Sequence, residues 1–249
     1  ALQQAMGIGC SVAGGDLLGL NPPKHGYVVY INAEDPEIIV KRRLHAIGQH
    51  LKMDAKESIA KHLMIEPMCG KMLNITDDAQ RERIINYCSG ARLIIFDTLS
   101  RIHNLDENNN SHAATLITLL EHIAVETNAA VLFLHHVSKA SAMGGMSELQ
   151  QAARGASALV DNARWCGYVA KMTKDQGKEY TERQFDKSPI DSDFVKNYIR
   201  FGVSKQNYGE MFFERWYKFN NGGVLKPAEL IKIPKAKQGR KGGTGNGWS

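Results

Sequence analysis

Three apolar segments of this chain end in polar or charged residues whose types suit phosphate chemistry. A carboxylate oxygen can hold Mg²⁺ beside a phosphate or take a proton from water, and an imidazole can bond a phosphate oxygen. Because these residues recur at the same place, just after an apolar segment, they suggest one shared site. They are Glu34 and Asp35 after the segment at 27–31, Asp97 and Thr98 after 93–96, and His135 and His136 after 131–134.

Each of these residues also has a plainer interpretation. Asp97 suits a Mg²⁺-nucleotide site, but an apolar segment that ends in Asp is common by itself. Glu34 suits a base that activates water, yet the dipeptide at 35–36 could simply cap the next helix. His136 suits a γ-phosphate sensor, although a histidine at a strand end often bonds only to backbone. Their coincidence favours the functional interpretation.

The elements that must position these residues alternate through the first 135 residues. Continuous apolar strands suit a parallel sheet that is covered on both faces, and strand–helix alternation favours right-handed βαβ units. The sequence therefore predicts an α/β fold with a doubly wound, mostly parallel central sheet and helices on both faces. We expect strands at 27–31, 64–66, 93–96 and 131–134, a first helix stopped by Gly14 and Gly15, and helices at 37–51, 54–63, 77–88 and 112–126. The helical period at 37–51 places Ile38, Leu44, Ile47 and Leu51 toward the core.

Open α/β sheets bind ligands outside the carboxyl ends of their strands. If the predicted strands are parallel neighbours, Glu34, Asp97 and His136 project into one crevice. Arg42 and Arg43, on the helix after Glu34, are better explained as a solvated helix face than as contacts to a nucleotide.

The chain changes character after His136. The segment that follows, as far as residue 157, is polar, contains glycine and shows no apolar period, which predicts a mobile loop. Strands are expected again at 164–170, 194–204 and 211–219, and the last two form a C-terminal β-hairpin with its turn at 205–210.

Composition limits the class of protein. The chain has 249 residues, 43% of them hydrophobic, which is enough for a sizeable core. No apolar segment approaches the roughly 18 to 20 residues that span a bilayer, and the N-terminus lacks the features of a secretory signal. We therefore expect a cytoplasmic protein with no membrane partner. The four cysteines form no CxxC pair, which predicts reduced core thiols and neither a zinc site nor a disulfide framework.

The net charge of +5 is concentrated at the C-terminal end. Residues 232–249 contain five lysines and arginines, no acidic residue and many glycines. Such a segment cannot bury enough surface to offset its ordering entropy. We therefore expect residues 1–231 to form the folded core and residues 232–249 a disordered basic tail. The tail could serve solubility alone, or it could contact nucleic acid or a partner protein.

Five motifs follow one another in an order that is specific in combination: YVVYINAEDP, RLIIFDTLSRIH, AAVLFLHHVSKAS, RGASALVDNARW and RFGVSKQNYG. In this order they resemble the RepA-type hexameric replicative helicases of broad-host-range plasmids, within the RecA-like P-loop ATPases. The resemblance extends from the first helix to about Pro227. It implies a RecA-like fold, ATP and Mg²⁺ as cofactors, a homo-hexamer that translocates on single-stranded DNA, a replication initiator or primase as a further partner, and a bacterial plasmid or mobile element as the source.

The resemblance also implies roles for the residues at the strand ends. Glu34 would be the catalytic carboxylate that polarises the attacking water, with Asp35 beside it. Asp97 would be the Walker B aspartate that holds Mg²⁺, and Thr98 would share the nucleotide site. His136 would be the sensor that couples the state of the γ-phosphate to the following loop.

Residues of the C-terminal half would complete the site from a second subunit. Arg164 matches an arginine finger that reaches the ATP of the neighbouring subunit, although a structural ion pair with Asp161 is the alternative. Lys205 and Tyr208 fall where related ring helicases have a second cationic finger and a residue that packs against the nucleotide. Asn207 departs from the pattern, because some relatives have arginine there.

One motif of the family is absent from the 249 residues: the phosphate-binding loop GxxxxGK followed by Ser or Thr. In the family this loop precedes the helix with which the chain opens, and Ala1 is not an initiator methionine. We therefore expect the sequence to start just after the loop and the chain alone to bind and hydrolyse ATP poorly. Evolutionary loss of the loop is the alternative.

DNA contact is expected from the segment after His136. The resemblance places this segment at the central channel of a ring, where Lys139, Gln151 and Arg154 could follow a sugar-phosphate backbone without reading bases. Because the segment contains no aromatic residue, its affinity for DNA should depend strongly on salt. A plain flexible loop is the alternative.

Three functions remain compatible with these features. The leading prediction is an ATP-driven ring helicase that acts on single-stranded DNA. The second is a RecA-like ATPase for recombination or for loading a partner, without strand separation. The third is a DNA-binding protein that has lost its enzymatic activity.

Overall fold

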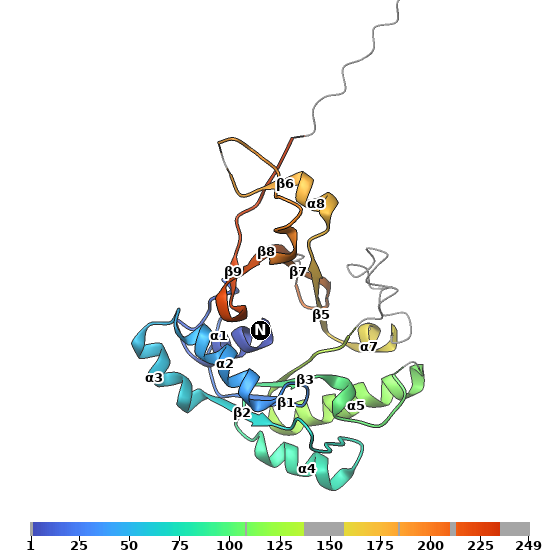
Figure 1. Cartoon of the computed structure of the whole chain (residues 1–249). Helices are drawn as coiled ribbons and strands as arrows, with labels where there is room; N and C mark the ends of the chain where they lie inside the picture. The colour runs from blue at the N-terminus through green and yellow to red at the C-terminus, as the bar shows by residue number, and fades with distance from the viewer. Residues whose placement is uncertain (1, 108, 137–156, 184, 210–212, 235–249) are drawn as a thin grey trace, which may run out of the picture.

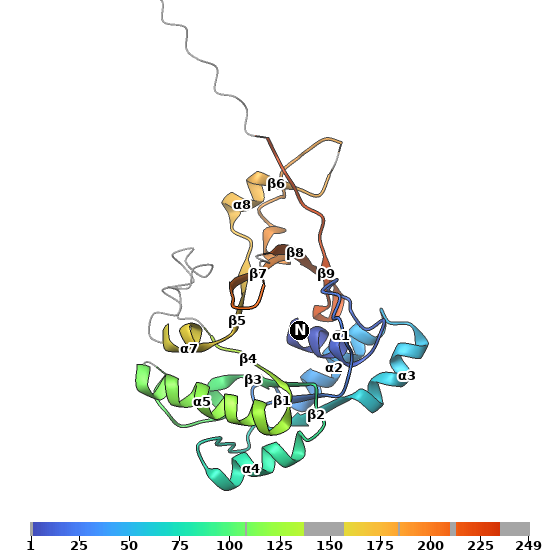
Figure 2. The same ribbon diagram turned by 180° about the vertical axis from the view of Figure 1, so that it is seen from behind.

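The computed structural model describes residues 2–107, 109–136, 157–183, 185–209 and 213–234. Its two four-stranded sheets lie one above the other in Figure 1, with the first helix, α1 (Leu2–Ser11), between them. Figure 2 shows the same arrangement from behind. Within the described ranges, no helix is long and apolar enough to cross a membrane.

The lower sheet is parallel and its strands are joined by helices, as the sequence predicts. Its further elements are β1 (Val28–Asn32), α2 (Glu37–Gly48), α3 (Met53–His62), β2 (Leu63–Pro67), α4 (Asp78–Tyr87), β3 (Leu93–Asp97), the 3₁₀ helix η1 (Leu99–Arg101), α5 (Asn110–Thr127) and β4 (Ala130–Phe133). The strand order is β2-β1-β3-β4, and every neighbouring pair is parallel. The carboxyl ends of all four strands therefore lie at one edge, where the register places Asn32 opposite Asp97.

Alternate side chains of β1 enter two different cores. Val29 and Ile31 pack with residues of α4 and α5, whereas Val28 and Tyr30 pack with residues of α1 and α2. Both faces of the strand are buried for this reason, which explains its continuous apolar sequence. The prediction of an α/β sheet with helices on both faces is confirmed.

Polar residues at both ends of α5 fix where it stops. The side chain of Asn109 accepts a hydrogen bond from the backbone N–H of Ser111 at 2.9 Å, which caps the N-terminus. At the other end Asn128 adopts a left-handed conformation with φ of 53°, and its N–H bonds the last carbonyls of the helix. This turn leads directly into β4, whose carboxyl end carries His135 and His136.

The upper sheet is antiparallel, with strand order β5-β7-β8-β9. The elements of this part are α7 (Ser157–Asn162), β5 (Trp165–Lys171), α8 (Lys174–Glu179), β6 (Tyr180–Thr181), η4 (Val195–Asn197), β7 (Tyr198–Gln206), β8 (Glu214–Phe219), η5 (Asn221–Gly223), β9 (Leu225–Pro227) and β10 (Ile231–Lys232). β6 and β10 form a separate two-stranded sheet. Ala5 and Ile8 of α1 share a core with Phe201 of β7 and Tyr217 of β8, so this helix joins the two sheets.

Three details differ from the expectations. Ile38 is 55% exposed and Val40 takes its place in the core, because the buried side of α2 is turned relative to the predicted one. Residues 195–197 form a 3₁₀ helix, so the strand expected from residue 194 begins at Tyr198. All four cysteines are free and Cys88 is buried, but Cys69 is exposed and is not a core thiol.

Candidate functional site

Glu34 and His136 meet at the carboxyl edge of the parallel sheet. The Nε2 atom of His136 lies 3.2 Å from Oε2 of Glu34, although 102 positions separate the two residues in the sequence. Since Glu34 follows β1 and His136 follows β4, the contact crosses the end of β3, the strand that ends in Asp97. Both side chains remain open to solvent, with 42% of Glu34 and 69% of His136 exposed, so a ligand can reach them.

Asp97 lies at the same edge, but its side chain is buried in hydrogen bonds. Its Oδ2 accepts from the Tyr30 hydroxyl at 2.5 Å and from Nε2 of Gln3 at 2.7 Å. Burial and the neighbouring Asp97 carboxylate raise the pKa of Tyr30 well above its ordinary value, so the phenol remains protonated and keeps donating. These bonds fix the orientation of the carboxylate before any ligand binds.

The loop after β1 is held by its own residues. The side chain of Asn32 donates to the backbone oxygen of Asp35 at 2.5 Å, which orients the turn that carries Glu34. The carboxylate of Asp35 forms an ion pair with Arg43 of α2. Arg43 is therefore engaged with the site loop, and the expectation of a solvated helix face is wrong for this residue.

Thr98 faces away from solvent. Its hydroxyl donates to the backbone oxygen of Leu134 at 2.6 Å, and the residue is 2% exposed. This bond joins the end of β3 to the residue just after β4. Thr98 therefore holds two strand ends together, and its hydroxyl is committed to that role in this structure.

Arg164 lies on a different part of the surface, just before β5. Its Nη2 atom is 3.5 Å from Oε1 of Glu121 on α5, and the two side chains are 64% and 52% exposed. The alternative expected from the sequence, a pair with Asp161, is wrong, because Glu121 is the partner. Its exposure leaves the guanidinium accessible to another molecule.

The end of the β7 hairpin lies beside Arg164. The backbone N–H of Asn207 donates to the carbonyl of Arg164 at 3.1 Å. The ammonium of Lys205 donates to the backbone oxygens of Val160 at 3.0 Å and Asp161 at 2.5 Å, at the C-terminal end of α7. Lys205 thus caps a helix end within its own chain, whereas Tyr208 is 81% exposed.

The residues expected to touch DNA, Lys139, Gln151 and Arg154, lie outside the described residues. The same holds for residues 235–249 of the basic tail. Their roles remain predictions from the sequence.

Sequence reasoning missed two residues that contact Asp97. Tyr30 carries a hydroxyl inside the apolar segment YVVYI, and a phenol within a strand that is buried on both faces was the signal that could have found it. Gln3 stands in the first turn of α1 and gives no such signal, because its contact with Asp97 spans 94 positions.

The donor set at this edge fits Mg²⁺ bound together with phosphates. Mg²⁺ is commonly held by one or two carboxylates, with substrate phosphates and water completing its shell. Asp97 supplies a hard, oriented oxygen ligand at the end of β3. In the ranges that the structure describes, no group of three or more His, Cys, Asp or Glu side chains could hold a metal ion by itself. The residues therefore suit a metal that arrives with a nucleotide.

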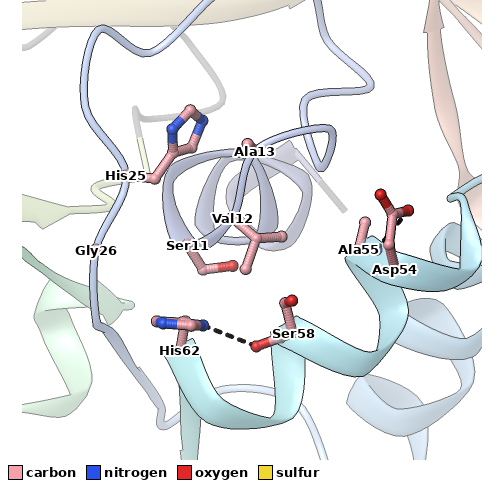
Figure 3. Close-up of a pocket in the computed structure, with 9 residues that line it drawn as sticks. All are labelled: Ser11, Val12, Ala13, His25, Gly26, Asp54, Ala55, Ser58 and His62. Carbon is pink, nitrogen blue, oxygen red and sulfur yellow. Dashed lines mark hydrogen bonds between the residues drawn. The ribbon is translucent and has the colours of Figure 1, made fainter.

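A pocket of about 370 Å³ lies elsewhere, between the end of α1 and α3. Figure 3 shows Ser11, His25 and His62 among its lining residues, with His62 hydrogen-bonded to the backbone oxygen of Ser58. Gly26, also in its lining, precedes β1, whereas Glu34 follows β1. The pocket therefore belongs to the amino edge of the sheet and is separate from the candidate site.

Comparisons with known proteins agree with this architecture. A solved ATPase domain is 13% identical, covers 82% of this chain and 75% of that chain, and superposes with a TM-score of 0.54, which shows a shared RecA-like α/β fold. A RadB recombinase is 12% identical and covers 82% of this chain and 80% of that chain, with a TM-score of 0.43. A family model described as an AAA domain matches residues 4–142, more than half of the chain. The chain therefore belongs to the AAA domain family of ATPases.

Proposed function

We propose that this chain is the ATPase subunit of a RepA-type ring helicase. In this proposal ATP is hydrolysed where two subunits of a homo-hexamer meet, and the ring translocates on single-stranded DNA. Glu34, Asp97 and His136 act from one subunit, and Arg164 acts from its neighbour. A replication initiator or primase would be a further partner.

The observation that carries the proposal is the contact between Glu34 and His136 across the end of β3. A carboxylate that bonds an imidazole at 3.2 Å and remains partly exposed can orient a water molecule. The same imidazole can move to a phosphate oxygen when nucleotide is present, which would release Glu34. The pair therefore has the chemistry of a switch that responds to the γ-phosphate.

Asp97 would hold Mg²⁺, which when bound neutralises charge on the phosphates. The chain's own contribution is to orient this carboxylate. Tyr30 and Gln3 both donate to Oδ2, so the side chain is fixed before the nucleotide arrives. Preorganisation of this kind avoids a cost of ordering during the reaction.

The position of Arg164 supports a site shared between subunits. In one chain this residue pairs with Glu121, an exposed contact of little expected stability. A neighbouring subunit could therefore draw the guanidinium away at small cost and place it on a transferring phosphate. An arginine supplied in this way raises turnover by roughly 10³ to 10⁵ in nucleotide hydrolases.

Strand separation on a forked DNA substrate tests the proposal. The assay uses the protein as encoded, with any residues that precede Ala1, because the 249 residues contain no GxxxxGK motif. ATP-dependent unwinding is the expected result. DNA-stimulated hydrolysis without unwinding would favour a recombination or loading ATPase instead. DNA binding with no hydrolysis would leave only a non-enzymatic role.

A further inference from the structure

Glu107 bridges two histidines next to the candidate site. It lies in the turn before α5. Its Oε1 is 3.0 Å from Nε2 of His103, and its Oε2 is 3.3 Å from Nδ1 of His135. All three side chains are largely buried, with 2% of His103, 20% of Glu107 and 21% of His135 exposed. His135 directly precedes His136, which contacts Glu34.

The proton positions on His103 follow from its partners. Its Nδ1 accepts the backbone N–H of Leu105 at 3.2 Å, so Nδ1 must carry a lone pair. A ring with a lone pair on Nδ1 is neutral and has its proton on Nε2. That proton is donated to Glu107, because an ionised carboxylate can only accept.

His135 must have the opposite tautomer. Its contact with the same carboxylate is made through Nδ1, so Nδ1 carries the donated proton. Burial lowers the pKa of His135, the charge of Glu107 opposes this, and His136 and His103 add to the lowering. The ring is therefore neutral near neutral pH and its Nε2 is unprotonated.

The backbone alone does not fix the segment that carries His135 and His136. The last backbone hydrogen bonds that the structure describes here are made by Leu134, whose N–H bonds Phe96 and whose carbonyl accepts from Leu99. Beyond Leu134, the described contacts of the segment are those of the two histidine side chains. The position of His136 thus depends on how its neighbour is held.

We propose that Glu107 is a positioning residue: it holds His135 in the Nδ1–H tautomer and thereby fixes the end of β4 from which His136 reaches Glu34. Its effect on catalysis rests on the proposed function, but the tautomers do not. The bond network transmits no charge to the substrate. It determines where the sensor histidine starts from.

Nitrogen-15 NMR of the imidazoles in the unchanged chain tests the arrangement directly. Signals of His103 and His135 are assigned from single His→Gln variants. We expect His135 to show a protonated Nδ1 and an unprotonated Nε2 near neutral pH, and His103 to show the reverse. A doubly protonated His135, or one protonated only at Nε2, would overturn the proposal.

The Glu107→Gln variant tests whether the carboxylate imposes the tautomer. An amide has one oxygen and cannot accept from both rings, so we expect His135 to populate both tautomers. The matched control is Glu126→Gln, which removes a carboxylate from an exposed histidine contact of 3.8 Å on α5 and should leave His135 unchanged. An unaltered His135 spectrum in a folded Glu107→Gln variant would contradict the assignment.

Turnover supplies the functional test. In the protein with ATPase activity, Glu107→Gln should lower kcat about tenfold, as loss of an orienting partner typically does, with little change in KM for ATP. An unchanged kcat would refute the positioning role. If the unchanged protein has no ATPase activity, the proposed function fails, and the NMR result still decides the tautomers.

Discussion

The hydroxyl of Tyr30 donates to Oδ2 of Asp97 across the neighbouring strands β1 and β3, with 2.5 Å between the two oxygens. Both residues are almost completely buried, Tyr30 at 1% and Asp97 at 2% exposed. A buried carboxylate is costly unless donors satisfy it. Tyr30 therefore stabilises the fold and orients the carboxylate through the same bond.

Replacing Tyr30 by Phe should destabilise the chain. The variant keeps the ring and removes one donor from a buried charge, so we expect the free energy of unfolding to fall by about 2 kcal/mol. Urea unfolding followed by circular dichroism measures this change. Tyr87→Phe is the matched control, because Tyr87 donates to the carboxylate of Glu66 at 3.0 Å while 42% exposed. Equal losses in both variants would contradict the special role of the buried bond.

The four thiols should react at very different rates. Burial raises the pKa of Cys88 to about 12, so almost no thiolate is present at neutral pH, whereas Cys69 is exposed. Burial also raises the pKa values of Cys10 and Cys166, which are partly buried. Maleimide labelling followed by peptide mass spectrometry should find Cys69 modified first and Cys88 last. Early labelling of Cys88 in the folded chain would contradict the packing of α4 against the sheet.

The sequence predicts this fold well because its strands are buried on both faces. β1 and β3 are continuous apolar segments, and their parallel pairing brings the residues that follow them to one edge. The contact of Glu34 with His136 follows from that topology alone. The bonds of Asp97 to Tyr30 and Gln3 could not be predicted, because they join segments 67 and 94 positions apart without any periodic pattern.

Surface partners were also beyond the sequence. Arg164 has an acidic residue nearby in Asp161, but it pairs with Glu121 from another helix. An exposed ion pair depends on how α5 and β5 lie relative to each other, and neither local sequence carries that information.

A site shared between subunits predicts a distinctive result in mixing experiments. Arg164→Ala and Glu34→Gln should each remove nearly all DNA-stimulated ATPase activity. When the two variants are mixed before assembly, some interfaces contain both an intact Glu34 and an intact Arg164, so activity should partly return. Turnover of the mixture is compared with that of each variant alone. No recovery in mixed rings would contradict a site shared between subunits.

The Glu121→Gln variant separates catalysis from stability at Arg164. The pair is exposed on both sides, so its loss should change the free energy of unfolding by about 0.5 kcal/mol or less. ATPase activity should be retained, since the arginine is expected to leave this partner on assembly. A large loss of activity in Glu121→Gln would show that the ion pair within one chain is what matters.

The most direct test compares DNA-stimulated ATP hydrolysis by Glu34→Gln and Glu37→Gln. The two residues are close in the sequence, but Glu37 only pairs with Lys41 on the exposed side of α2, whereas Glu34 contacts His136. Loss of a positioned general base predicts a fall in kcat of at least about 10² for Glu34→Gln. Glu37→Gln should match the unchanged protein. Full turnover by Glu34→Gln would contradict the proposed catalytic site.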